Sequence, residues 1–227
     1  MFWIVKKRIL LLFIGFFLLS GGVVLIATSV RQVDSPNTKM SIVIDCGHGG
    51  DDGGAIGKLG VSESYLNLQY GKELRKLCED VGFRVVMTRS DMNGLYSATA
   101  QNKKRSEMEK RAKIINESGA TLVVSIHMNS FPLQSCRGAQ VFYRKENEGG
   151  KELAQNIQKQ FSDKIIGAKT QAKEGDFFVL NCTEKPAVLV ECGFLSNEEE
   201  EKSLCDENYR KEFCKSLLMG ILEFYSA

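Results

Sequence analysis

The sequence predicts a single α/β domain, in which a mostly parallel, roughly six-stranded sheet carries helices on both faces, preceded by an N-terminal transmembrane or signal segment. Two observations predict the sheet. Short apolar runs rich in β-branched residues alternate along the chain with longer stretches of helical periodicity. The order strand, helix, strand, helix, strand is typical of parallel pairing, because parallel strands need a long crossover connection.

The N-terminal segment is predicted from an uncharged, strongly apolar run over residues 9–28, which follows a basic cluster at residues 6–8. The run is long enough to span a bilayer, and the basic flank favours an orientation that keeps it in the cytoplasm. A cleaved signal peptide is the alternative, with Ala27 and Ser29 beside the cleavage site. Both readings place the rest of the chain outside the cytoplasm.

These readings divide the chain into an anchor or signal peptide over 1–31, a linker over 32–40 and one folded domain over 41–227. Within the domain, the apolar periods predict strands at 41–45, 83–87, 121–126, 139–143, 177–180 and 187–191. They predict helices at 63–80, 103–118, 150–166 and 206–225.

Local signals support several helix ends. Ser62 is a good N-cap for the first helix, which should end before Gly82. Ser196 and Glu199 have the spacing of a capping box, and the acidic residues at 198–201 would favour the positive end of a short helix there. We therefore expect an additional short helix after the last strand.

Two long connections are expected to carry function. Residues 46–62 include seven glycines and no regular apolar pattern, which predicts a loop that turns sharply and approaches another group closely. Residues 88–102 form a second long loop on the same rim of the sheet. Long loops in compact domains are usually functional.

The charge distribution argues against nucleic-acid binding. The chain has a net charge of +2, but residues 1–32 contain four basic and no acidic residues, and subtracting these four charges leaves −2 for the remainder. A nucleic-acid partner would normally require a Lys/Arg-rich face. The triplet at 103–105 opens a predicted helix and is interpreted as a solvated face.

The seven cysteines show no metal-binding or redox pattern. An odd number leaves at least one thiol unpaired, and no CxxC pair is present. In an exported protein, such thiols indicate small buried hydrophobes or a reducing habitat. Cys46 and Cys192 are noted as a pair because both would lie at strand ends.

The two histidines of the chain, His48 and His127, each follow a strongly apolar predicted strand. Ligands gather at the carboxyl ends of strands in a parallel sheet, so both imidazoles can converge on one ion. A catalytic zinc site of this type also needs a carboxylate and an open position for water. The candidates in the first loop are Asp45, Asp51, Asp52 and Glu63.

Among these carboxylates, Glu63 is favoured because it begins the helix after the loop, and the connection from His48 can fold back to place the two side by side. The alternative is an acid that only stabilises its own helix dipole. Glu191 closes the apolar strand at 187–191, where a carboxylate must be paired or catalytic to be tolerated. Its alternative is a salt-bridged strand end.

Six sequence blocks resemble the zinc-dependent N-acetylmuramoyl-L-alanine amidases of the amidase-3 family. They are Asp45 to Gly57 (D-P-G-H-G-G-x-D-x-G-A-x-G in the family), Glu63 to Leu68 (E-x-x-x-N-L), Thr88 to Asp91 (T-R-x-x-D in the family, with one residue fewer before the aspartate here), Arg111 to Asn116 (R-x-x-x-x-N), Ser125 to Asn129 (S-I-H-x-N) and Val190 to Asn197 (V-E-x-G-F-L-S-N). The resemblance covers residues 41–225 and identifies 41–227 as a zinc amidase catalytic domain.

The resemblance implies one Zn²⁺ ion held by His48, Glu63 and His127, with Glu191 as the catalytic acid and base. Cys46 stands where the family usually has proline, which leaves a Cys46 thiolate as an alternative ligand. Asp45 is expected to accept a hydrogen bond near a ligand imidazole.

The implied substrate is peptidoglycan, cleaved at the amide between N-acetylmuramic acid and L-alanine. The short chain with one export segment is similar to germination-specific amidases of spore formers, which implies a role in spore cortex maturation and germination and a membrane-associated or lipoprotein partner for targeting. The alternatives are a vegetative cell-wall amidase, a zinc peptidase that acts within the stem peptide, and a non-enzymatic binding protein.

Overall fold

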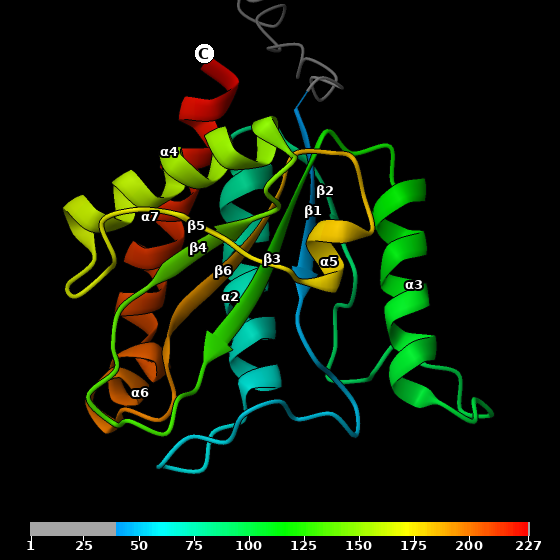
Figure 1. Cartoon of the computed structure of the whole chain (residues 1–227), viewed down its shortest axis with the longest axis horizontal. Coiled ribbons are helices and arrows are strands. Elements are labelled where there is room, and N and C mark those ends of the chain that lie inside the picture. The colour runs from blue at the N-terminus through cyan, green and yellow to red at the C-terminus, as the bar shows by residue number, and fades with distance from the viewer. Residues whose placement is uncertain (1–39, 227) are drawn as a thin grey trace, which may run out of the picture. The chain divides into compact units, whose positions relative to one another are not determined.

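The computed structural model describes residues 40–226 and shows the predicted α/β architecture (Figure 1). Six strands form one sheet in the order β2-β1-β3-β6-β4-β5. Their bounds are β1 Ser41–Cys46, β2 Arg84–Met87, β3 Leu122–Asn129, β4 Gln140–Tyr143, β5 Lys173–Glu174 and β6 Ala187–Phe194. The pairs β1–β2, β1–β3, β3–β6 and β4–β5 are parallel and β4–β6 is antiparallel, so the prediction of a mostly parallel sheet is confirmed.

The predicted anchor or signal peptide over 1–31, and the predicted linker up to residue 39, lie outside the described residues. Within residues 40–226, no helix is both long enough and apolar enough to cross a membrane.

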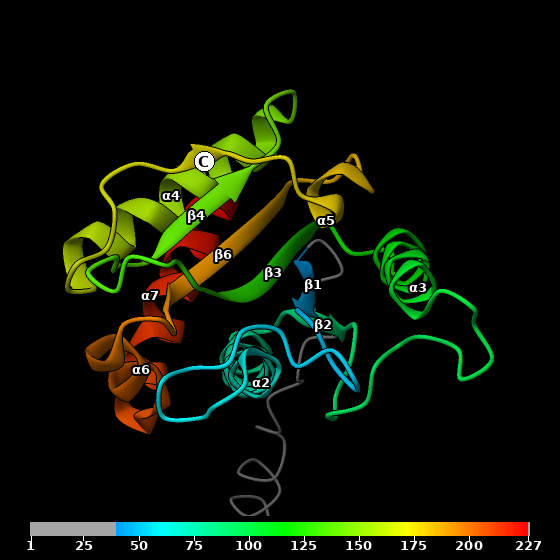
Figure 2. The ribbon, with the colours of Figure 1, turned by 60° about the horizontal axis from the view of Figure 1, so that its bottom comes forward.

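Helices cover both faces of the sheet (Figure 2). They are α2 Glu63–Asp80, α3 Lys103–Glu117, α4 Glu148–Lys164, α5 Phe178–Asn181, α6 Glu198–Cys205 and α7 Glu207–Ser226. The larger apolar core joins one sheet face to α2, α4, α6 and α7. The smaller core joins the other face to α3 and α5.

Strand alternation decides which side chains reach each face. Along β3, Val124 and Ile126 belong to the larger core, whereas Val123 belongs to the smaller one. His127 therefore lies on the face that carries α3 and α5. By the same alternation Glu191 lies on that face, since Val190 and Cys192 belong to the larger core.

The predicted strand at 177–180 is wrong, because this segment forms the one-turn helix α5. Val179 and Leu180 are buried in the smaller core, whereas Phe178 is 47% exposed. A run of four apolar residues does not distinguish a strand from a helical turn by periodicity. The remaining strand of the sheet is instead the exposed pair Lys173–Glu174, which lacks the apolar character of a predicted strand.

The N-cap predicted for α2 is confirmed, whereas the N-cap predicted for α6 is wrong. Ser62 caps α2 by accepting a hydrogen bond from Tyr65 N. The predicted capping box at Ser196 is wrong, since Asn197 caps α6 and accepts from the amides of Glu199 and Glu200. Ser196 Oγ instead accepts from Phe131 N, which ties the loop after β3 to the end of β6.

Candidate metal centre

His48, Glu63 and His127 come together at the carboxyl end of the sheet, although they lie far apart in the sequence. One potential ligand atom from each residue lies within 4.8 Å of the others. Glu63 Oε1 is 3.2 Å from His48 Nε2 and 2.9 Å from His127 Nδ1. Donor atoms about 2.0–2.1 Å from one tetrahedral zinc ion lie roughly 3.3 Å apart, so the spacing and the chemistry of the three donors fit Zn²⁺.

Three different elements supply these side chains. His48 lies in the glycine-rich loop after β1, Glu63 is the first residue of α2, and His127 lies near the end of β3. Glu63 is buried, while the two histidines are partly exposed. This arrangement leaves the imidazoles accessible from the side of the sheet that carries α3 and α5.

Backbone and side-chain donors fix the Glu63 carboxylate from several directions. Oε2 accepts from Ala55 N at 3.0 Å, while Oε1 accepts from Met128 N at 3.2 Å and from Asn67 Nδ2 at 3.3 Å. Burial alone would raise the pKa of Glu63, but hydrogen bonds and charge interactions with both histidines outweigh burial and lower this pKa. Glu63 is therefore an oriented, ionised carboxylate, as a metal ligand must be.

Asp52 orients His48 from the other side of the ring. Its Oδ2 lies 2.9 Å from His48 Nδ1, and its Oδ1 accepts from Gly54 N. A carboxylate on the second ring nitrogen fixes the tautomer that leaves Nε2 free for a metal. Asp52 therefore occupies the position beside an imidazole that the sequence had suggested for Asp45.

The other sequence candidates for metal ligands point elsewhere. Asp45 is fully buried and accepts hydrogen bonds from Arg111, Ser125 and Thr88, so its hydrogen-bond donors are these three side chains and not a ligand imidazole. Asp51 instead forms an ion pair with Lys103 at the surface.

Cys46 does not join the metal cluster either. Its side chain is buried in the larger core, on the opposite face of β1 from Asp45, and burial raises the pKa of its thiol to about 12. A protonated, buried thiol is a poor zinc ligand. Cys46 and Cys192 are both free thiols, so the two residues noted as a pair form no disulfide.

Glu191 lies directly beside His127, because these two residues are register partners in the β3–β6 pair. Its Oε2 is buried and has no hydrogen-bond partner within the part of the chain that the structure describes. Burial, together with the nearby negative charge of Glu63, raises the pKa of Glu191 to about 7, although the two histidines oppose this shift. A carboxylate with one buried oxygen that has no hydrogen-bond partner is suited to proton transfer at this position.

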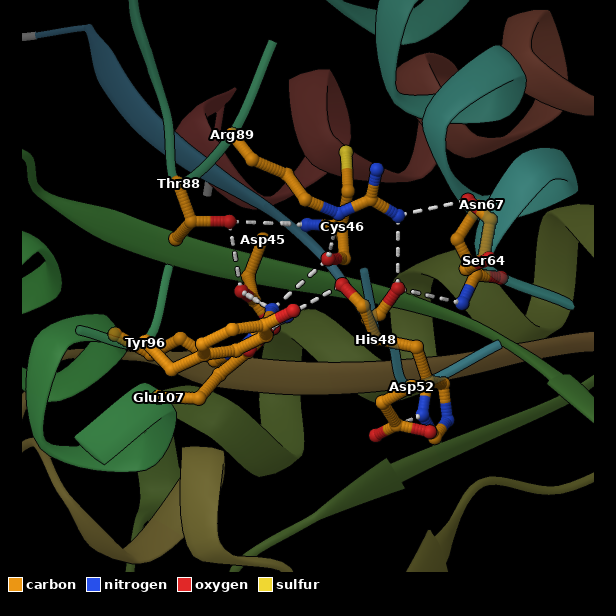
Figure 3. Close-up of polar contacts among 12 residues, drawn as sticks. Asp45, Cys46, His48, Asp52, Ser64, Asn67, Thr88, Arg89, Tyr96 and Glu107 are labelled. Atoms are coloured by element: carbon orange, nitrogen blue, oxygen red, sulfur yellow. Dashed lines mark hydrogen bonds and ion pairs between the residues drawn. The ribbon is translucent and has the colours of Figure 1, made fainter. Parts of the chain in front are cut away.

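Two buried arginines, Arg89 and Arg111, hold the loop that carries His48, and Figure 3 shows Arg89 beside Cys46. Arg111 donates to Cys46 O at 2.8 Å and to His48 O at 2.7 Å, and it forms ion pairs with Asp45 and Glu107. Arg89 donates to Cys46 O and to Gly47 O. These contacts fix the backbone on both sides of Gly47.

No role for these two arginines was predicted from the sequence. Their signal was present in the T-R-x-x-D and R-x-x-x-x-N blocks, but their acceptors are backbone carbonyl groups that a sequence pattern does not reveal. The close approach predicted from the glycines is observed at Gly47. A Cβ there would lie 2.3 Å from the His127 ring, so only glycine lets the loop cross this imidazole.

The N-acetylmuramoyl-L-alanine amidase family model matches residues 42–223, which is most of the chain. The chain belongs to this family. Members of this family hydrolyse the N-acetylmuramoyl-L-alanine amide of peptidoglycan. The three donors His48, Glu63 and His127 are able to hold a metal ion. The family identifies the hydrolase class.

Several members of the amidase family are similar over most of the chain. A germination-specific N-acetylmuramoyl-L-alanine amidase of Bacillus subtilis is 33% identical over 190 residues, covering 82% of this chain and 79% of the relative. The CwlD amidase of Clostridioides difficile, solved in complex with the GerS lipoprotein, is 36% identical with a TM-score of 0.78, covering 82% of this chain and 98% of that one. An N-acetylmuramoyl-L-alanine amidase of Clostridium difficile 630 is 31% identical with a TM-score of 0.74, covering 84% and 98%.

Proposed function

We propose that this amidase uses one zinc ion, held by His48, Glu63 and His127, to hydrolyse the amide between N-acetylmuramic acid and L-alanine. The observation that carries the proposal is the convergence of these three donors beside Glu191, whose buried Oε2 has no partner within residues 40–226. A three-donor site with an adjacent carboxylate is the arrangement of hydrolytic zinc centres.

Each protein group has a separate task in this reaction. Asp52 and Glu63 hold the His48 ring in place, and the backbone amides on Glu63 hold its carboxylate. When bound, zinc would supply Lewis acidity, lowering the pKa of water and polarising the scissile carbonyl. Glu191 takes the proton of the attacking water and delivers it to the departing alanine nitrogen.

Replacing Glu191 tests this assignment. We expect Glu191→Ala to bind zinc stoichiometrically, because the three ligands remain, and to lose at least about 100-fold in kcat, the lower end of what general acid–base catalysis contributes. Zinc content by atomic emission and stem-peptide release from purified peptidoglycan are the two measurements. Glu174→Ala, on the exposed edge strand, is the matched control and should keep full activity. A zinc-loaded Glu191→Ala protein with wild-type activity would contradict the role.

A zinc peptidase acting within the stem peptide would use the same four groups. Mass spectrometry of the products separates the two reactions, since an amidase leaves the lactyl carboxylate of muramic acid free and a peptidase does not. The family match favours the amidase reaction.

The biological role that we propose is removal of stem peptides in the spore cortex, during cortex maturation with muramic lactam formation and in germination. The germination-specific relative of Bacillus subtilis supports this role over that of a vegetative amidase. The test is expression of the chain in a spore former that lacks its own germination-specific amidase. Restored muramic lactam in the cortex, absent with Glu191→Ala, is the expected result, and unchanged lactam content with active enzyme would favour the vegetative role.

We also propose that residues 1–31 anchor or export the catalytic domain over 41–227 through the linker at 32–40, so that the enzyme acts outside the cytoplasm. The extracytoplasmic location of peptidoglycan supports this placement. A lipoprotein partner for targeting is proposed because the similar CwlD amidase was solved with the GerS lipoprotein. Robust activity of the full chain alone on isolated sacculi would contradict a required partner.

A further inference from the structure

A hollow beside the three proposed zinc ligands continues over the N-terminal part of α3. One part of this hollow is lined by His48, His127 and the apolar side chains of Val179 and Leu189. An adjoining part is lined by Asp51, Tyr96 and Lys103, and the two parts share Asp52, Lys104 and Met108. Lys104 therefore lies at the boundary between the part of the hollow beside the proposed metal ligands and the adjoining part.

Lys104 differs from the other cations of this hollow in having no ion pair within residues 40–226. Lys103 pairs with Asp51 at 2.6 Å and stacks over the Tyr96 ring. Arg111 is buried and neutralised by Asp45 and Glu107. An unpaired ammonium beside a reaction centre is available to an anionic group of a substrate.

The substrate of the proposed reaction presents such a group close to the scissile amide. The residue that leaves is L-alanine, whose methyl group matches the apolar wall at Met108 and Val179. The next stem residue is a D-glutamate that continues the chain through its side-chain carboxyl and keeps its α-carboxylate free. Because one extended residue spans about 3.3–3.6 Å, this carboxylate lies within about two residues' length of the scissile carbon.

We propose that this hollow holds the peptide side of the scissile bond and that Lys104 binds the first free carboxylate of the stem peptide. Lys104 is thus a specificity-determining residue that distinguishes a carboxylate from a carboxamide at the second stem position. The inference rests on the proposed amidase function and names the substrate feature that the site recognises. Since Lys104 is solvent-exposed, the ion pair should contribute about two- to fivefold in kcat/KM rather than several orders of magnitude.

The test uses the full chain loaded with Zn²⁺ and two defined muropeptides that differ only at the second residue, one with the free α-carboxylate and one with the carboxamide. Wild-type protein should cleave the carboxylate substrate with the higher kcat/KM by about two- to fivefold. Lys104→Gln should bring this ratio close to one by losing activity on the carboxylate substrate alone. Lys110→Gln, an exposed lysine of the same helix that does not line the hollow, is the matched control and should keep the wild-type ratio.

The ratio separates substrate binding from effects on the metal. If Lys104 acted only through Asp52 and His48, Lys104→Gln would weaken zinc binding and lower both kcat/KM values equally. A wild-type ratio retained in Lys104→Gln, or equal cleavage of both substrates by wild-type protein, would overturn the inference. Absence of lactyl–alanine cleavage of either substrate by zinc-loaded wild-type protein would overturn the proposed function, and this inference with it.

Discussion

His48 is the only residue other than glycine, within residues 40–226, whose backbone has a positive φ, at 60°. This conformation is costly for most residues with a Cβ, so surrounding contacts must hold it. Arg111 binds the carbonyl of His48 and Asp52 contacts its ring. These two contacts therefore hold the His48 backbone in its costly conformation.

The protonation of His48 predicts how the metal-free protein responds to pH. Burial alone would lower the pKa of His48, but the hydrogen bonds and charges of Glu63 and Asp52 outweigh it and raise this pKa from 6.5 to about 9. Because the folded-state pKa lies above the unfolded one, the stabilisation is complete below about pH 6.5 and is lost as pH rises through about 9. Urea unfolding of EDTA-treated protein between pH 6 and 9.5 should show this decline in the free energy of unfolding.

His48→Asn is the control for this titration, since asparagine tolerates the positive φ and does not titrate. Its decline over the same pH range should be shallower than that of the wild-type protein. Parallel pH profiles for the two proteins would contradict the prediction.

At the scale of elements, α3 contributes to the centre by holding the loop after β1 rather than by supplying a ligand. Arg111 is buried and connects this helix to Asp45 and to the carbonyls of Cys46 and His48. The guanidinium is suited to this task because its planar fork reaches several acceptors at once.

Arg111→Lys should therefore loosen the loop while keeping the positive charge. Loss of charge-assisted hydrogen bonds is expected to lower the free energy of unfolding by about 2–3 kcal/mol and to weaken zinc binding. Chemical denaturation and a zinc competition assay with a chromogenic chelator measure the two effects. Arg105→Lys, an exposed residue of the same helix, should change the free energy of unfolding by less than about 0.5 kcal/mol. Unchanged zinc affinity in Arg111→Lys would show that α3 does not support the ligand loop.

The sequence predicted those elements whose signal is local. The apolar β-branched runs around Ile42, Val123 and Val188 predicted three buried strands. The two histidines lie at the predicted carboxyl ends of the first two strands, and this position predicted that their side chains meet. The segment at 177–180 was misassigned because a short apolar run fits either a strand or a helical turn.

Long-range polar contacts account for most of what the sequence did not predict. Asp45 lies near the end of β1 and precedes a ligand, yet it pairs with Arg111 on a distant helix, and no local pattern indicates that partner. Asn197 rather than Ser196 caps α6 because the Ser196 hydroxyl is used by Phe131 N on another loop. Both outcomes depend on elements that meet only in the folded chain.

At the scale of the whole molecule, the proposed ion joins the loop after β1, the start of α2 and the end of β3. A ligand that binds only the folded state stabilises it by about 2.7 kcal/mol at 100 times its Kd. For a domain of this size, removal of zinc by EDTA should lower the Tm by about 5–11 °C. Calorimetry with and without EDTA checks this shift, and His127→Ala should show no response to the chelator. An EDTA-insensitive wild-type Tm would contradict a structural contribution of the ion.

The two halves of the centre differ in how firmly the chain holds them. His127 and Glu191 are neighbours in a ladder of backbone hydrogen bonds at the middle of the sheet, whereas His48 depends on side-chain contacts to a surface loop. Local opening follows the weakest cooperative unit of a fold. Exchange or loss of the ion should therefore begin with release of His48 while the imidazole–carboxylate pair on the strands stays assembled, which makes metal release reversible without global unfolding.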